Sequence, residues 1–223
     1  YTISSASFDT VHQGSDKIVT YTVTLNSTGT AANYILTESA AEVNASITKK
    51  PLTVSIAAIS DQTFNGYAQT PAVLPEADGV VDGYPLTELV DYTVAYENNF
   101  NAGEAQVVLS ATEGSDYAFE AAATTFQILK AAAPTVQNLP ISIKYDTVGS
   151  QTVRMTGLPS NCGTAAYTLG TVEDPNGILS ALPVIAEDGT ITYTLTGQET
   201  FAEGMTATIP VTVVMQNYED VTV

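Results

Sequence analysis

Adjacent acidic residues are the most prominent groups in this sequence that could perform chemistry. They occur as Glu173-Asp174, Glu187-Asp188 and Glu219-Asp220, while Glu76, Asp78 and Asp82 cluster around two turns. A glycosidase needs two carboxylates that face each other across a cleft, which neighbouring residues of one strand and turn cannot provide by themselves. Calcium binds several oxygens in a flexible geometry, but the regular spacing of acids and glycine in a calcium loop is absent. We therefore favour solvated turns over a calcium site at these positions, and we predict no metal-binding residue.

Cysteine and histidine offer little material for catalysis. Cys162 is the only cysteine and His12 the only histidine, and they lie far apart in the sequence. No intramolecular disulfide can form, and a reactive thiol needs neighbours that stabilise the thiolate. The sequence also lacks the common nucleophile, zinc-protease and phosphate-loop motifs. We therefore predict a structural Cys162, no catalytic residue, no cofactor and a protein that is not an enzyme.

One lysine and one asparagine could form a covalent cross-link. A lysine buried beside an asparagine and an acid can close an intramolecular amide bond with loss of ammonia. Lys144 and Asn217 are candidates, because we expect them in the first and last strands of the same domain. Burying an amine is costly without special surroundings, so the cross-link stands as a secondary hypothesis.

The charge of the chain excludes several classes of partner. It has 24 acidic and 6 basic residues, a net charge of −18, and no lysine or arginine after Arg154. Such a surface repels the phosphate backbone of nucleic acids and anionic membranes. No apolar run approaches the length of a membrane span. We expect no nucleic-acid partner and no membrane insertion in this segment.

A pattern of glycine, β-rich run and tyrosine occurs three times. Gly14, Gly103 and Gly204 each precede an alternating run, which is followed by Asn33-Tyr34, Asp116-Tyr117 and Asn217-Tyr218, respectively. The interval from glycine to tyrosine is the same in the second and third copies and is longer in the first. Repetition on this scale is typical of an array of similar domains. We expect the three tyrosines to be buried corners, whose hydroxyl groups bond to a nearby connection.

The repeats predict an all-β fold of tandem small β-sandwiches, of the immunoglobulin-like kind, in an elongated array. We expect a first repeat at residues 1–50, a second at 51–131 and a third at 132–223. The first is expected to be the back part of a repeat, the second to be complete, and the third to be cut at its last strand. The alternating runs expected as strands include 18–25, 52–56, 91–96, 105–109, 141–145, 151–155, 191–195 and 209–214. Within the first run, Val19, Tyr21, Val23 and Leu25 are expected to face inward.

Four runs in and around the second repeat form a recognisable set: Ile47-Thr48-Lys49-Lys50-Pro51-Leu52-Thr53-Val54, Asp61-Gln62-Thr63-Phe64-Asn65-Gly66, Asp91-Tyr92-Thr93-Val94 and Asn98-Asn99 to Gly103. On these runs, the second repeat resembles the MBG and YDG type of bacterial surface repeat and related immunoglobulin-like domains. Phe64 replaces the more usual tyrosine of the opening motif. Residues 1–50 are similar to the back half of such a repeat, and Lys144-Tyr145-Asp146 is similar to the opening motif.

The resemblance implies a place and a role without implying any catalytic residue. Such repeats occur in cell-surface and secreted proteins of bacteria, in tandem stalks beside adhesive or catalytic domains. We therefore expect a non-catalytic spacer, an adhesin-like stalk, on a Gram-positive cell wall or in a secreted protein. Its partners would be adjacent domains of the same chain and an unknown extracellular glycan or protein. The alternative is a carbohydrate- or protein-binding accessory module of a surface enzyme, with an aromatic patch at Tyr92 and Tyr96.

Overall fold

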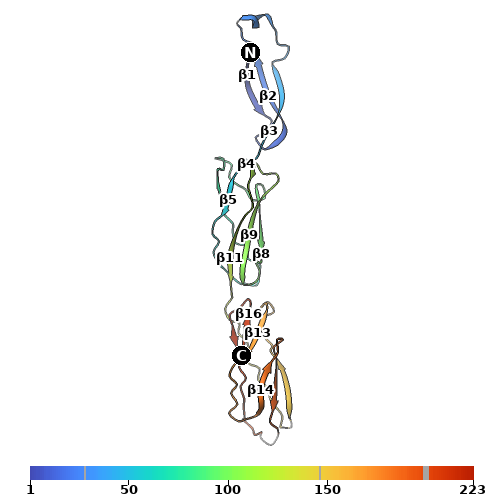
Figure 1. The fold of residues 1–223 in the computed structure, drawn as a ribbon, viewed down its shortest axis with the longest axis vertical. Helices are drawn as coiled ribbons and strands as arrows, with labels where there is room; N and C mark the ends of the chain where they lie inside the picture. The colour runs from blue at the N-terminus through green and yellow to red at the C-terminus, as the bar shows by residue number, and fades with distance from the viewer. Residues whose placement is uncertain (28, 146, 198–200) are drawn as a thin grey trace. The chain divides into compact units, whose positions relative to one another are not determined.

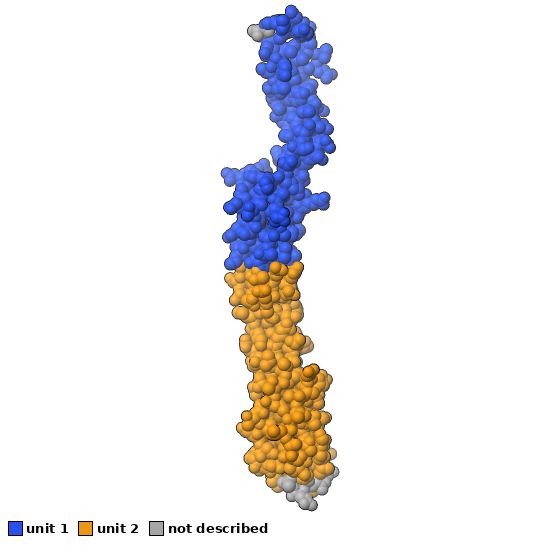
Figure 2. All heavy atoms as spheres, viewed as in Figure 1, with its two compact units in different colours: residues 1–58, 72–95, 107–124 blue, residues 59–71, 96–106, 125–223 orange. Residues whose placement is uncertain are grey.

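The computed structural model describes residues 1–27, 29–145, 147–197 and 201–223, and it shows an all-β protein (Figure 1). The one helical element in these ranges is a short 3-10 helix, η1 (Gly29–Asn33). None of the described residues belongs to a helix long and apolar enough to cross a membrane. The chain divides into two compact units (Figure 2). Unit 1 comprises residues 1–58, 72–95 and 107–124, and unit 2 comprises 59–71, 96–106 and 125–223.

Three small sheets lie within unit 1. The first has the order β1-β2-β3 and is antiparallel, with strands β1 (Thr2–Phe8), β2 (Gly14–Thr24) and β3 (Ala40–Ile47). The second pairs β4 (Lys50–Pro51) with β10 (Tyr117–Ala118) in parallel. The third pairs β5 (Thr53–Ile56) with β7 (Pro75–Asp78) in antiparallel register. Pro51 is the last residue of the two-residue strand β4, opposite Ala118.

The first sheet has a half-buried face and no covering layer among the described residues. Val19, Tyr21, Val23 and Leu25 are half-buried, whereas Ile18 on the opposite face is exposed. The alternation therefore correctly predicted which face points inward. None of these side chains is fully buried, because the described part of this sheet is one layer thick and every residue of β1 is exposed.

A four-stranded sheet occupies the middle of the sequence. Its order is β6-β11-β9-β8, with strands β6 (Gln62–Thr63), β8 (Tyr92–Glu97), β9 (Gly103–Ala111) and β11 (Ala122–Leu129). The central strand β9 buries Ala105, Val107 and Leu109 completely. Full burial on one face with partial exposure on the other is the period-two pattern that the sequence predicted for this run.

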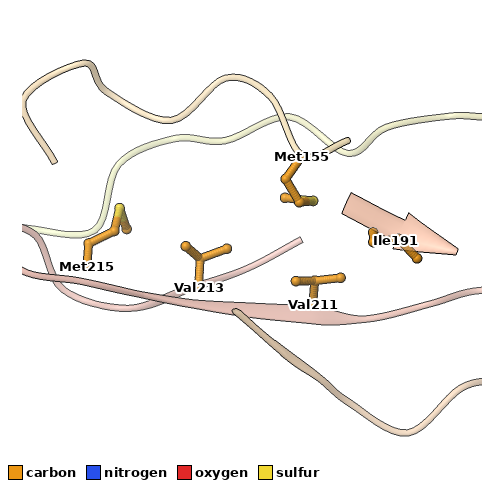
Figure 3. Close-up of a cluster of buried hydrophobic side chains, with 5 residues drawn as sticks. All are labelled: Met155, Ile191, Val211, Val213 and Met215. Carbon is orange, nitrogen blue, oxygen red and sulfur yellow. The ribbon is translucent and has the colours of Figure 1, made fainter. Parts of the chain in front are cut away.

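Two three-stranded sheets in unit 2 share one core. One has the order β12-β15-β14, with strands β12 (Gly149–Arg154), β14 (Leu179–Ile185) and β15 (Thr190–Leu195). The other has the order β13-β16-β17, with strands β13 (Ala165–Leu169), β16 (Val211–Met215) and β17 (Val221–Thr222). Figure 3 shows the buried cluster of Met155, Ile191, Val211, Val213 and Met215, which the two sheets and the residue after β12 supply.

One expected strand is absent. Residues 141–145 alternate apolar and polar side chains, yet the chain there is irregular and all five residues are exposed. Alternation predicts a strand only when a neighbouring strand is present to pair with, and no strand pairs with this segment in the described part of the chain. The prediction of a strand at 141–145 is therefore wrong for this structure. Asp146, which completes the motif suggested for this segment, lies outside the described residues.

Candidate functional site

Side-chain contacts join the first repeat to the second within unit 1. The carboxylate of Asp116 accepts a hydrogen bond from the His12 Nδ1 at 2.7 Å and one from the backbone N–H of Gln13 at 2.7 Å. The backbone N–H of Lys50 donates to the carbonyl of Asp116 at 2.8 Å, beside the parallel β4–β10 pair. The Lys49 ammonium donates to the carbonyl of Glu113 at 2.6 Å. We call this set of contacts the N-terminal joint.

A matching set joins the second repeat to the third within unit 2. The Asn217 Oδ1 accepts from the backbone N–H of Ala102 at 2.9 Å, and its Nδ2 donates to the Asn101 Oδ1 at 3.0 Å. The backbone N–H of Ala131 donates to the carbonyl of Asn217 at 2.9 Å, next to a parallel bridge between Ala131 and Tyr218. These contacts form the C-terminal joint.

The two joints use equivalent positions of the repeat. In each, the residue before the corner tyrosine, Asp116 or Asn217, accepts a backbone N–H from the residue just before the repeat glycine, Gln13 or Ala102. In each, the same side chain also bonds to the residue one position earlier, His12 or Asn101. In each joint, the backbone carbonyl of Asp116 or Asn217 also accepts a hydrogen bond from a backbone N–H of the segment that links the two repeats. One geometry is therefore built twice from different side chains at equivalent positions of the repeat.

Asp116 is held in place by both of its neighbours. Ser115 is buried, and its hydroxyl donates to the carboxylate of Asp91 at 2.7 Å. Tyr117 is buried too, and its hydroxyl donates to the carbonyl of Tyr84 at 2.8 Å and accepts from the N–H of Val81 at 3.3 Å. The expected tyrosine corner is thus confirmed at Tyr117. These hydrogen bonds hold the backbone next to Asp116 in place.

Removing the hydroxyl of Tyr117 tests this corner. We expect Tyr117→Phe to lower the free energy of unfolding by about 1–2 kcal/mol, because the carbonyl of Tyr84 and the N–H of Val81 lose a partner in a partly buried place. Urea denaturation of both proteins would measure the difference. Tyr34→Phe is the matched control and should change nothing, since the Tyr34 side chain is exposed. Equal effects of the two substitutions would contradict a corner role for Tyr117.

Asn217 is also held from both sides, and it is fully buried, with 0% of its surface exposed. Its Nδ2 donates to the carbonyl of Asn161 at 2.9 Å, and the Tyr218 hydroxyl lies 3.0 Å from the Asn161 Oδ1. The chain next to Asn161 comes close enough because Gly163 has φ +73° and no side chain. A Cβ at Gly163 would lie 2.7 Å from the Cβ of Gln216. The glycine therefore permits the close approach that buries the joint residue.

Aromatic rings add an apolar contact to the C-terminal joint. Phe64 is 3% exposed, and its ring meets Phe100 edge-on at 6.0 Å and Tyr218 edge-on at 5.5 Å between centroids. Edge-to-face pairs of this kind add to the stabilisation from area burial. At the rim, the Lys130 ammonium pairs with the carboxylate of Asp220 at 3.3 Å. The C-terminal joint thus combines a buried amide network with an aromatic contact.

Charge distinguishes the two joints. The hydrogen bond from His12, followed by the one from the backbone of Gln13, lowers the pKa of Asp116 below its ordinary value of 3.8. A carboxyl group whose pKa is lowered by folding stabilises the fold above its unfolded pKa, and this contribution disappears as the pH falls through the folded pKa. The N-terminal joint should therefore weaken below about pH 4. Asn217 carries no charge, so the equivalent group of the C-terminal joint does not titrate.

Asp116→Asn isolates this charge. The amide can still accept from the N–H of Gln13, and the side chain of Asp116 is 38% exposed, so we expect a loss of at most about 1 kcal/mol at pH 7. The difference between the variant and the original chain should be smaller at pH 3 than at pH 7, because the contribution of the carboxylate is lost as the pH falls toward its lowered pKa. Urea denaturation at both pH values provides the measurement. A loss that is the same at both pH values would show that the carboxylate charge contributes nothing.

The acidic pairs act as turn residues in the structure. The carboxylate of Asp174 accepts the backbone N–H groups of Ile178 and Leu179, each at 2.9 Å. Asp188 accepts from the hydroxyl and N–H of Thr190, and these bonds lower its pKa. Among the described residues, no three histidine, cysteine, aspartate or glutamate side chains gather as a metal site. Cys162 is a free, half-buried thiol packed against the core cluster shown in Figure 3.

Two other sequence hypotheses do not hold. Tyr34 was expected to be a buried corner, but it is 70% exposed, beside a first sheet that no described layer covers. Lys144 and Asn217 were expected to approach each other. Lys144 is exposed, whereas the amide of Asn217 is committed to Asn101, Ala102 and Asn161. The structure therefore does not bring the cross-link pair together.

The tyrosines suggested as a ligand platform face inward. Tyr92 is buried, and burial together with the charge of Glu88 raises its pKa. Tyr96 is half-buried, and its hydroxyl donates to the carbonyl of Pro71 at 2.5 Å. A sugar platform needs exposed rings, so this face does not offer one.

The joints were missed by sequence reasoning, although a signal for them was present. Asp or Asn recurs before each of the three tyrosines, but the pattern by itself indicates a role only for the tyrosine. The partners of Asp116 and Asn217 lie more than a hundred positions away, at His12 and Asn101. A polar residue two positions before the repeat glycine in both of these copies could have suggested the pairing.

No protein-family model, no curated protein and no solved structure matches this chain.

Proposed function

We propose that this chain is a non-catalytic spacer segment of a bacterial cell-surface or secreted protein, an adhesin-like stalk of immunoglobulin-like repeats in series. The observation that carries the proposal is the repetition of one joint geometry, through Asp116 and through Asn217. A spacer needs neighbouring domains held in a fixed relation, and hydrogen bonds that the side chains of Asp116 and Asn217 accept from the preceding hairpin support such a role. The MBG-type resemblance of the junction sequences and the net charge of −18 support an exported location.

Restricted motion at the joints is the property that a spacer requires. Spin labels at Gln127 and Ala166, exposed strand residues on either side of the C-terminal joint, would report it in a Cys162→Ala background. We expect one narrow distance distribution, which broadens when Asn217 is replaced by alanine. A broad distribution with the joint residues intact would contradict the proposal.

A binding module is the competing function, and it requires a ligand. A glycan array and a binding assay with bacterial and host cells should give no signal for this segment alone. Reproducible binding of one glycan class would instead support an accessory module of a surface enzyme. Turnover of a polysaccharide or peptide by the purified segment would refute the non-catalytic role.

A further inference from the structure

The third repeat contains a groove of about 1050 Å³ that opens beside its core. Much of its lining is apolar and comes from the two sheets and from two irregular segments of unit 2. The apolar side chains that matter here are Ile141, Ile143, Met155, Ile191, Ile209 and Val211. Met155, Ile191 and Val211 also belong to the buried cluster of Figure 3, so the groove leads directly into the core.

One wall of the groove has the character of an unpaired strand. Ile141, Ser142 and Ile143 alternate in polarity, and within the described chain no backbone hydrogen bond reaches them. Ile141 and Ile143 are 46% and 36% exposed while lining the groove. A segment whose backbone N–H and C=O groups are unpaired can serve as a template for another strand.

In the second repeat, the segment equivalent to residues 141–144 is paired with another strand. Its β6 lies parallel to the end of β11, with Gln62 opposite Ile128 and Thr63 opposite Leu129. The N–H of Phe64 donates to the carbonyl of Leu129 at 2.9 Å. In sequence, the run Lys144-Tyr145 matches Thr63-Phe64, as the opening-motif resemblance indicates. The segment before Lys144 is therefore the counterpart of β6.

The position of the counterpart of β11 follows from the corner tyrosines. Ala122 begins β11 at the same interval after Tyr117 that separates Val223 from Tyr218. Val223 pairs with Val211 through hydrogen bonds of 2.8 and 2.9 Å, and it also lines the groove. In β11, every second side chain points inward, and the last two of these, Phe126 and Ile128, are buried. The groove thus lies where the second half of such a strand would run.

We propose that this groove is a strand-accepting site, which takes an extended segment with alternating apolar side chains. The incoming strand continues the line of β17 and pairs in parallel with residues 141–144. Its backbone supplies the missing ladder hydrogen bonds, and its inward side chains fill the groove. A strand with the pattern of β11 fits, because apolar side chains at every second position match the apolar floor. The inference is independent of the proposed spacer function.

The test extends the chain after Val223 by the sequence of residues 123–129, which continues the inward and outward alternation of Val221 and Val223. We expect amide hydrogen exchange at Ile143 and Tyr145 to slow by about 10-fold or more, because their N–H groups would take the ladder positions of Gln62 and Phe64, and the N–H of Phe64 donates to the incoming strand in the second repeat. A matched extension, with aspartate at the positions of Phe126 and Ile128, should leave exchange unchanged.

Equal exchange in the two extended chains would overturn the proposal, and so would protection that appears only outside residues 141–145. A synthetic peptide of residues 119–130, added to the unextended chain, gives a second reading. Slower exchange at Ile143 would show that the site also accepts a strand from another molecule. Peptide binding that protects only the first sheet would place the acceptor elsewhere and refute the assignment.

Discussion

Asn217→Asp is expected to destabilise unit 2 by about 3 kcal/mol or more at pH 7, because it places a carboxylate in a buried site that was built for an amide. The Asn217 Nδ2 donates to the carbonyl of Asn161 and to the Asn101 Oδ1. A carboxylate oxygen in its place would face these two acceptors without a proton to share. Urea denaturation, followed by a probe in the third repeat, would measure the loss.

The pH dependence of this variant provides its own control. Burial raises the pKa of a carboxyl group, and a protonated acid can donate one hydrogen bond where the amide did. The loss should therefore shrink as the pH is lowered, which is opposite to the acid weakening expected at Asp116. Asn217→Ala should be destabilising at every pH. A loss for Asn217→Asp that is independent of pH would argue against a buried carboxylate as its cause.

Phe64→Ala is expected to cost about 3–5 kcal/mol, the range for truncating a buried aromatic side chain. Phe64 is almost completely buried and loses its ring contacts with both Phe100 and Tyr218. Since Tyr218 belongs to the third repeat, the substitution should both lower the free energy of unfolding and broaden the spin-label distances across the C-terminal joint.

Phe64→Leu separates the two consequences. Leucine keeps most of the apolar volume, so we expect a smaller loss of stability, although the edge-to-face contacts disappear. If the alanine variant unfolds more easily but keeps the narrow distance distribution, Phe64 serves the core of the second repeat and not the joint. If the distribution broadens in both variants, the aromatic contact itself holds the joint.

Local patterns in the sequence predicted much of the fold. The run Asp91 to Tyr96 became β8, and the run Ile191 to Leu195 became β15, because alternating β-branched and aromatic residues suit a sheet with one buried face. The turns at Asp174 to Gly177 and at Asp188-Gly189 also appear, held by aspartate side chains that bond to nearby N–H groups. Both kinds of signal are short in range, so a single sequence carries them.

Long-range pairing could not be predicted in the same way. Residues 141–145 alternate as regularly as β15 does, but their state depends on whether another strand lies beside them. Tyr34 follows an asparagine as Tyr117 follows an aspartate, yet only Tyr117 is buried, with its hydroxyl bonded to the connection that contains Val81 and Tyr84. The roles of Asp116 and Asn217 depend on partners from the preceding repeat. In each case the deciding contact lies outside the window in which a pattern can be recognised.

The placement of the few lysines has a consequence for proteolysis. Three of the six basic residues, Lys49, Lys50 and Lys130, lie in the joints. The peptide bond after Lys49 contains the N–H that donates to Asp116, and the bond after Lys130 contains the N–H that donates to Asn217. Lys50 is followed by Pro51, whose nitrogen is part of a ring. A trypsin-like protease must therefore wait for a joint to open before it can cut there, because cleavage requires the backbone to leave its hydrogen bonds.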